Sequence, residues 1–279
     1  MEIIKDIEYG RAGDIPLLLD TYIPETPISD PMPAVMWIHG GSWKSFSKST
    51  GSYHARYLAE HGFLTVSIDY RLSGVAPFPA AVEDCKCAVR WLRANTEKYN
   101  IDPSQIGVWG GSAGGHLAMM AGCADETVGL EGDGGWAELS SRVQAVCSSY
   151  GLNNLLESYK EIEEKRGSVL DSSREVQFLG CHPAENPDLW NAASPINHVT
   201  ADDPPLLLVH GELDQTAPII KSEQMYEAYQ QVGLEVTLVR ISEAGHAFKQ
   251  ETPNPISPSL DEIDQIILDF FIEHLVATR

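Results

Sequence analysis

Positive charge is scarce in this sequence of 279 residues. Lys and Arg number 19 against 40 Asp and Glu, which gives a formal net charge of −21. Such a field repels phosphate backbones and anionic lipid surfaces, so nucleic acids and membranes are poor candidates for partners. No run approaches the roughly 20 apolar residues of a membrane helix. The first residues also lack the basic flank and unbroken apolar core of a signal peptide, so we expect none.

Cysteine is sparse as well. The five cysteines are spread along the chain as Cys85, Cys87, Cys123, Cys147 and Cys181. Cys85 and Cys87 are two residues apart in a helical pattern and point in different directions, which disfavours a shared bond or metal. We therefore expect reduced thiols in a cytoplasmic protein. No H-E-x-x-H pattern and no Cys–His spacing of a zinc site occurs, so neither a metal nor an organic cofactor is expected.

The chain is rich in short apolar runs that alternate with amphipathic segments. Runs of Val, Ile and Leu predict buried strands at 34–38, 64–68, 106–109, 143–147, 206–209 and 236–239. Helical patterns lie at 53–61, 80–99, 115–124, 219–232 and 263–275. An early pair of segments, 6–9 and 17–22, predicts an antiparallel hairpin at one edge. This order predicts an α/β fold with a doubly wound, mostly parallel sheet and helices on both faces.

The alternation is interrupted between residues 151 and 205. That polar stretch is too long for a plain loop, and we expect a mainly helical insertion after the sixth strand. The whole chain, 1–279, is expected to be one domain. The insertion is either a solvated flap or a cap over a site at the strand ends, and the usual position of ligands in such sheets favours the cap.

A serine stands in a glycine-rich turn at 110–114, GGSAG, between a predicted strand and a predicted helix. This context fits the G-x-S-x-G pattern. So sharp a turn strains the backbone of Ser112, and side chains two positions away on either side would collide with neighbouring elements. A phosphate-binding P-loop would need Lys where this chain has His116, and the dinucleotide pattern G-x-G-x-x-G does not fit. The turn therefore predicts a nucleophilic serine.

A serine hydroxyl needs a base that takes its proton and an acid that orients the base. In this fold the chain order is serine, acid, histidine. Asp214 lies in the loop after the last predicted strand but one, with Glu212 as its nearest rival. His246 lies in the loop after the last predicted strand. The other histidines precede the acid, belong to the insertion or lie in the final helix, so we predict a triad of Ser112, Asp214 and His246.

Acyl transfer by a serine also needs donors for the oxygen that becomes negative in the transition state. The glycine-containing loop 39–43, HGGSW, follows a predicted strand and can turn its N–H groups inward. The N–H of Ala113, directly after the serine, would supply another donor. A glycine turn without any catalytic part is the alternative.

These pieces resemble the α/β-hydrolase superfamily, and more closely its hormone-sensitive-lipase-like and feruloyl/acetyl-xylan-esterase-like carboxylesterases. The matching stretches are HGGSW at 39–43, DYRL at 69–72, FPAAVEDC at 78–85, GGSAGG at 110–115, HGELDQTAP at 210–218 and AGHAF at 244–248. The resemblance implies Ser112 as nucleophile, Asp214 as acid and His246 as base. It further implies that Gly41, Ser42 and Ala113 donate to the oxyanion.

The chain departs from that family in two ways. Only about 38 residues precede HGGSW and they read as strands, so we expect no N-terminal helical cap of the hormone-sensitive-lipase kind, and the insertion is the cap candidate. Ser42 also replaces a third glycine and Trp43 follows it, an arrangement that occurs in kynurenine-formamidase-like relatives too.

The sequence thus predicts a serine carboxylesterase that hydrolyses short-chain or aryl carboxylic esters of small molecules through an acyl-enzyme. An arylformamidase or amidase with the same triad is the alternative. A non-catalytic small-ligand receptor on this fold is a more distant one, because such proteins typically lose a member of the triad. Trp43, Tyr150 and Trp190 are candidate pocket walls, although large aromatic residues pack in the core by default. The oligomeric state is not indicated.

Overall fold

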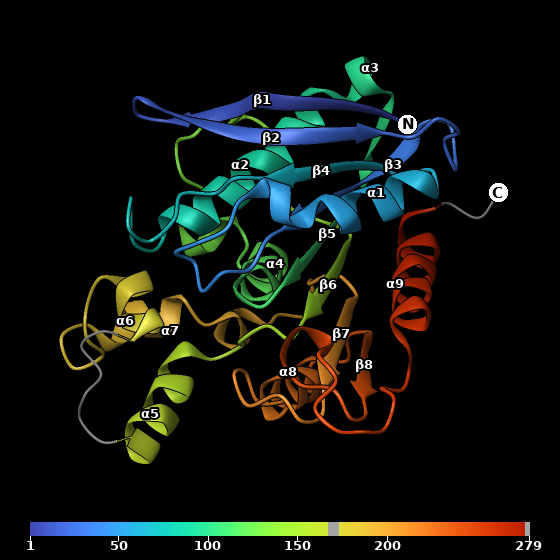
Figure 1. Ribbon diagram of the computed structural model, residues 1–279. Coiled ribbons are helices and arrows are strands. Elements are labelled where there is room, and N and C mark those ends of the chain that lie inside the picture. Colours follow the sequence, from blue (N-terminus) through green and yellow to red (C-terminus); the bar gives the residue numbers. More distant parts are fainter. Residues whose placement is uncertain (167–172, 277–279) are drawn as a thin grey trace.

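The computed structural model describes residues 1–166 and 173–276, whose strands form one eight-stranded sheet in the order β1-β2-β4-β3-β5-β6-β7-β8 (Figure 1). The strands are β1 Glu2–Ala12, β2 Ile15–Ile23, β3 Met32–Ile38, β4 Leu64–Ile68, β5 Ile101–Gly111, β6 Ala145–Ser149, β7 Leu206–Gly211 and β8 Val236–Ile241. The pairs β1–β2 and β2–β4 are antiparallel, and the other neighbours are parallel. The predicted α/β fold with a mostly parallel sheet and an edge hairpin is confirmed.

Helices cover both faces of the sheet. One face carries α2 Ala80–Ala94, α4 Ala113–Cys123 and α8 Ile220–Gln231, and the other carries α1 Ser52–Glu60 and α9 Leu260–Leu275. Side chains of β3 alternate between the two cores, because successive residues of a strand point to opposite faces. Met36 and Ile38 pack with the first group of helices, and Val35 and Trp37 with the second. Both faces of the sheet are therefore shielded from solvent, which explains the unbroken apolar runs of the parallel strands.

The helix predicted over 80–99 is two helices. After α2, the chain turns at Asn95 and continues as the short α3 Thr96–Tyr99. The side-chain amide of Asn95 donates a hydrogen bond of 2.8 Å to the carbonyl oxygen of Trp91. Such local bonds compete with the helical pattern, and they end the helix here despite its continuing apolar periodicity.

The insertion between β6 and β7 is mainly helical, as expected. It contains α5 Leu155–Arg166, α6 Arg174–Leu179, α7 Pro187–Ala192 and a 3-10 turn Pro195–His198, while its residues 167–172 lie outside the described part. These helices lie together at one side of the molecule, opposite α9 (Figure 1). The insertion is tied to the body of the fold, because the N–H of Phe78 donates to the carbonyl oxygen of the buried Phe178 at 2.7 Å.

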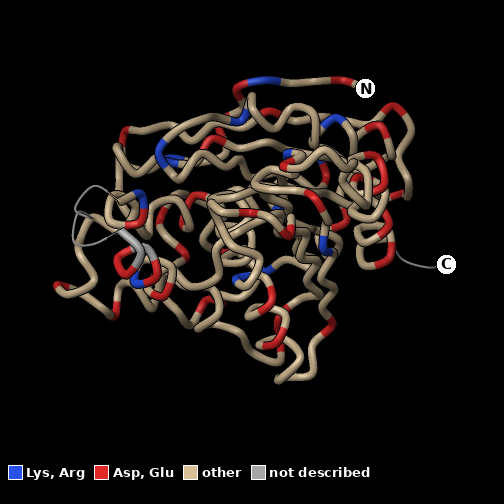
Figure 2. Tube along the Cα trace, turned by 60° about the horizontal axis from the view of Figure 1, so that its bottom comes forward, with Lys and Arg blue, Asp and Glu red and all other residues tan. Residues whose placement is uncertain are grey.

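Acidic residues are spread over the described chain and basic residues are fewer (Figure 2). Within the described residues, no helix is both long and apolar enough to cross a membrane. All five cysteines are free thiols, and only Cys181 is not buried.

Arg71, in the loop after β4, forms ion pairs with Glu83 and Asp84 of α2. The guanidinium of Arg71 donates from Nε to both carboxylate oxygens of Asp84 at 2.9 Å, and the backbone N–H of Arg71 donates to the same carboxylate at 2.7 Å. Asp84 is 1% exposed. Burial raises the pKa of Asp84 although Arg71 opposes the rise, so the carboxylate depends on this single partner.

We predict that Arg71→Met lowers the free energy of unfolding by about 3–5 kcal/mol, because it leaves a buried carboxylate without a partner. The pKa of Asp84 in the folded variant then lies further above its unfolded value. The loss should therefore grow as the pH rises, and it should be larger near about pH 8 than near about pH 5. Urea unfolding at the two pH values measures both effects.

The control is Arg240→Met, which removes the half-exposed partner of Glu223. An exposed pair of this kind contributes about 0–1 kcal/mol. Equal losses of unfolding free energy in the two variants would contradict the interpretation that Arg71 neutralises a buried carboxylate. A loss from Arg71→Met that does not change with pH would contradict it as well.

Candidate active site

Ser112 occupies the turn between β5 and α4. Its backbone has φ 57° and ψ −119°, a strained conformation for a residue with a side chain. A Cβ on Gly110 would lie 2.1 Å from the carbonyl oxygen of Gly114, and a Cβ on Gly114 would lie 2.0 Å from that of Ile38. The collisions that the sequence predicts two positions either side of the serine are therefore present. Close backbone contacts thus fix the conformation of the turn.

His246 contacts both other members of the predicted triad. Its Nδ1 lies 2.7 Å from Oδ2 of Asp214, and its Nε2 lies 3.0 Å from Oγ of Ser112. A carboxylate only accepts hydrogen bonds, so Nδ1 carries the hydrogen and Nε2 is left with a lone pair toward the serine hydroxyl. The three residues come from the loops after β5, β7 and β8. The imidazole lies between the hydroxyl and the carboxylate, which is the arrangement that proton transfer requires.

Asp214 is buried and surrounded by donors. Its Oδ1 accepts from the backbone N–H groups of Thr216 at 2.7 Å and Ala217 at 2.9 Å. Burial by itself would raise the pKa of Asp214, but the side chains of His210 and His246 and the N–H of Ala217 lower it well below its ordinary value. The carboxylate is therefore charged at neutral pH, whereas the rival Glu212 is exposed.

His210 is a neighbour of the triad that the sequence reasoning passed over. It is the last residue but one of the buried strand β7, and its Nε2 lies 2.7 Å from the carbonyl oxygen of Ala217 and 3.4 Å from Oδ2 of Asp214. The carbonyl requires a hydrogen on Nε2, so Nδ1 accepts from the hydroxyl of Ser222 at 2.7 Å. His210 thus holds the loop that carries the acid. The spacing of four residues between His210 and Asp214 is the signal that could have indicated the contact.

The loop after β3 presents free donors. Gly41, Ser42 and Trp43 all have positive φ, at 97°, 54° and 58°. Within the described residues, the backbone N–H groups of Gly41, Ser42 and Ala113 make no hydrogen bond to a protein acceptor. Gly41, Ser42 and Ser112 border one cavity, and Ser42, Ser112 and Ala113 border another. The residues predicted to donate to the oxyanion therefore border the cavities at Ser112, and their N–H groups have no protein acceptor among the described residues.

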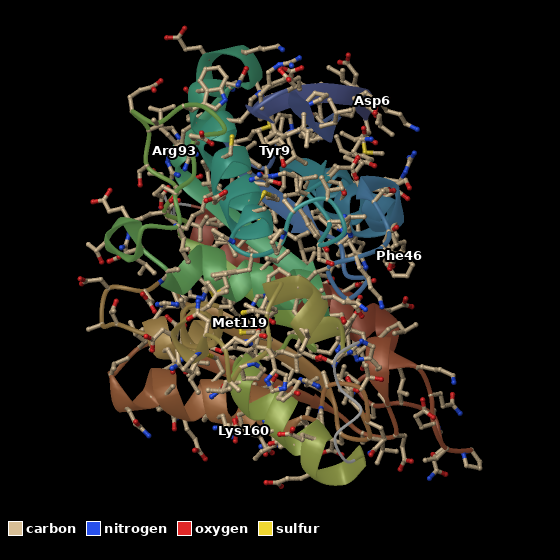
Figure 3. The ribbon with its side chains drawn as sticks, turned by 90° about the vertical axis from the view of Figure 1, so that its left-hand side faces the viewer. Asp6, Tyr9, Phe46, Arg93, Met119 and Lys160 are labelled. Atoms are coloured by element: carbon tan, nitrogen blue, oxygen red, sulfur yellow. The ribbon has the colours of Figure 1, made fainter. Side chains whose placement is uncertain are left out.

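Two cavities adjoin Ser112. The larger has a volume of about 420 Å³ and extends along Gly40, His54 and His246 to Phe46. Figure 3 shows Phe46 at the edge of the molecule, and its side chain is 61% exposed. The smaller has a volume of about 10 Å³. This is about the space that one water-sized group occupies.

The three aromatic wall candidates differ in position. Tyr150 borders both cavities and its ring meets that of His246 edge-on at 4.9 Å, and burial raises its pKa to about 12. Trp43 borders the smaller cavity, stacked on Phe178 at 4.5 Å. Trp190 is not among the described residues that border either cavity. It packs instead against Tyr159 in the insertion. Trp190 is fully buried, as is Trp43, but its contacts lie within the insertion and not at Ser112.

Trp43 is fixed by a histidine of α4. Its indole Nε1 donates to Nδ1 of His116 at 3.2 Å, and Nε2 of His116 donates to the carbonyl oxygen of Ala193 at 2.8 Å. Burial lowers the pKa of His116 to about 4, so the ring is neutral and can accept from the tryptophan. This chain of bonds connects the cavity wall to the insertion. In the described ranges 1–166 and 173–276, His, Cys, Asp and Glu do not gather into a metal-binding group of three.

The sheet order and the serine, imidazole and carboxylate on its strand-end loops define an α/β-hydrolase. Residues 19–229 match the family model BD-FAE, and the chain belongs to that family. The resemblance inferred from the motifs is confirmed at this level.

Curated relatives and solved structures agree with the family. Esterase LipQ of Mycobacterium tuberculosis is 31% identical over 246 residues, which cover 88% of this chain and 57% of LipQ. Esterase LipC of the same organism is 31% identical over 85% of this chain and 58% of its own length. The chain thus spans little more than half of these relatives.

Among solved structures, a truncated carbohydrate esterase from gut microbiota has a TM-score of 0.85 and 28% identity, and the match covers 99% of this chain and 97% of that one. A propionate-bound esterase of Thermogutta terrifontis has a TM-score of 0.78 and 25% identity, with 99% and 96% covered.

We predict that Gly114→Ala disrupts the serine turn, because its new methyl group would have to displace the backbone of Ile38. Overpacking of this kind costs about 1–3 kcal/mol or more. Gly74→Ala is the matched control, since no atom lies within 4 Å of the Cβ that it would add. Urea unfolding of both variants measures the difference. A Gly114→Ala protein as stable as Gly74→Ala would show that the turn is not tightly packed.

Proposed function

We propose that this chain is a serine carboxylesterase that hydrolyses short-chain or aryl carboxylic esters through an acyl-enzyme, with Ser112, His246 and Asp214 as its triad. The observation that carries the proposal is the pair of contacts of His246, one to the carboxylate of Asp214 and one to the hydroxyl of Ser112, whose backbone is strained. Its relatives support it, because a carbohydrate esterase and several esterases are among them. Thermogutta terrifontis esterase 2 has also been solved phosphoramylated by tabun, a reaction typical of serine nucleophiles.

In the proposed mechanism, each step of acylation belongs to a named atom. Oγ of Ser112 attacks the ester carbonyl carbon while Nε2 of His246 takes the hydroxyl proton. The carbonyl oxygen becomes negative and accepts hydrogen bonds from the N–H groups of Gly41, Ser42 and Ala113. The carbon–oxygen bond to the alcohol then breaks, and His246 gives the alcohol its proton.

Deacylation repeats these steps with water. Water attacks the acyl carbon and gives its proton to His246, the bond to Oγ breaks, and the serine oxygen recovers the proton. Asp214 stays ionised throughout and stabilises the imidazolium that forms. Each proton that leaves a nucleophile thus returns to a leaving oxygen.

Two alternatives use the same fold. An arylformamidase or amidase would use the same triad, and parallel assays of 4-nitrophenyl acetate and an N-formyl arylamine distinguish it from an esterase. A small-ligand receptor would bind without turnover. The contact of a histidine with both a carboxylate and the serine hydroxyl favours catalysis, because a receptor needs no proton transfer.

We also propose that residues 1–279 act as one α/β-hydrolase domain and that 151–205 cap its site. Arg174 from α6 borders both cavities beside Ser112, which supports a role of the insertion in substrate contact.

We predict that Ser112→Ala abolishes labelling by a fluorophosphonate probe and lowers kcat for 4-nitrophenyl acetate by about 10⁴–10⁶-fold, because no other group supplies the nucleophile. Ser104→Ala, an exposed serine at the opposite end of β5, is the control and should keep both properties. In-gel fluorescence and initial rates measure the outcome. Labelling that persists in Ser112→Ala would assign the nucleophile elsewhere.

We predict that small acyl groups are preferred, because the cavity bordered by Trp43, Leu152 and Ala217 has room for about one small group. The value of kcat/KM should fall at least about tenfold from 4-nitrophenyl propionate to the octanoate. Leu152→Ala should reduce that difference by removing a buried wall. An undiminished rate with the octanoate in the unaltered protein would place the acyl chain in the larger cavity.

A further inference from the structure

The cavities at Ser112 differ in charge from the rest of the protein. The chain has 40 acidic residues, yet among the described residues no Asp or Glu borders either cavity. One permanently charged side chain borders both, and it is the cation Arg174. The neighbouring His54 is neutral, because burial lowers its pKa to about 4. A protein with a net charge of −21 thus has a site whose described walls carry one positive charge and no carboxylate.

Arg174 is held in place by two hydrogen bonds. Its Nε donates to Oε1 of Glu175 at 2.7 Å, and its Nη2 donates to the carbonyl oxygen of Thr216 at 2.9 Å. Glu175 is 1% exposed, so this carboxylate is a buried anchor that faces away from solvent. Thr216 belongs to the loop that carries Asp214. The guanidinium is therefore fixed between α6 and the triad loop before any ligand arrives.

The guanidinium of Arg174 has hydrogen-bond donors without a partner among the described residues. Within the described residues, Nη1 of Arg174 makes no hydrogen bond, and Nη2 uses only one of its two hydrogens. A planar guanidinium with free N–H groups matches the two oxygens of a carboxylate. Among the described residues, no carboxylate on the cavity walls competes for those donors, and the carboxylate of Glu175 binds Nε.

The sizes of the cavities decide which half of an ester carries the anion. The cavity of about 10 Å³ beside Ala113 and Leu152 accommodates a small acyl group and no carboxylate in addition. The cavity of about 420 Å³ has room for the alcohol half. Arg174 also borders that larger space.

We propose that Arg174 forms an anion subsite, and that the favoured substrates are esters of small acyl groups whose alcohol half carries a carboxylate. This inference rests on the proposed esterase function for turnover, but the subsite itself requires only binding. The alcohol half is a hydroxy acid, and the carboxylate accepts from the free N–H groups of Arg174 while its ester carbonyl lies at Ser112.

The kinetic test compares 4-acetoxybenzoate with the neutral 4-acetoxybenzamide, each rate divided by that of hydroxide hydrolysis. Hydrogen bonds to charged groups predict that kcat/KM of the unaltered protein favours the anion by about 10–100-fold. Arg174→Gln should remove most of this preference and Arg174→Lys should keep part of it. The double variant Arg174→Gln, Glu175→Gln removes the buried charge that the single change would leave unpaired, and it should lose the preference as well.

The control is Arg11→Gln, which changes the net charge equally at an exposed position on β1 and should leave the preference intact. A preference that survives both Arg174→Gln variants overturns the proposal, and so does its absence from the unaltered protein. A third arm compares 4-nitrophenyl hydrogen succinate with its methyl ester. A preference for the anion there, and not for 4-acetoxybenzoate, would overturn the assignment to the alcohol half.

A binding measurement separates this inference from the proposed function. Calorimetry compares 4-hydroxybenzoate with 4-hydroxybenzamide on the unaltered protein and on Arg174→Gln, and needs no turnover. Binding of the anion that depends on Arg174, without hydrolysis of any ester, would refute the esterase and keep the subsite. Hydrolysis of both esters, with the acid bound no better than the amide, would refute the subsite and keep the esterase.

Discussion

The backbone of Ser112 is held at a positive φ by contacts that leave no room for change. The turn from β5 into α4 passes so close to β3 that Gly114 abuts the carbonyl oxygen of Ile38. The hydroxyl of Ser112 lies beyond the strand ends, where the loops after β7 and β8 place Asp214 and His246. Because the strain is borne by the packed sheet, the serine is positioned before a substrate arrives.

Electrostatics at the site follow from the same packing. Asp214 keeps its charge in a buried position because two backbone N–H groups and two imidazoles surround it. His210 extends this arrangement one step further, from Asp214 to Ser222 on α8. The carboxylate that orients His246 is thus itself oriented, by groups on three separate elements, and a proton on Asp214 would break several of these bonds at once.

Much of this was predictable because the physical signals are local. Strands buried on both faces need continuous apolar runs, and the predicted runs fall within or beside β3 to β8. The proposed triad followed from chain order, since each of its residues lies in the loop or turn that follows a strand. Signals that depend on tertiary contact were missing. Arg174 lies in the insertion, where no periodicity marks a wall residue, and Trp190 resembles a wall in sequence although it packs against Tyr159. Asn95 ended a helix through a side-chain bond that hydrophobic periodicity does not register.

The fold separates chemistry from recognition. The proposed triad and oxyanion donors come from loops of the sheet, and their geometry depends on strands that pack in the two cores. We propose that recognition depends on the insertion, which contributes Arg174 to the cavity walls and bonds to Trp43 through Ala193 and His116. Changes within the insertion can therefore alter which alcohol or acyl group fits without moving Ser112.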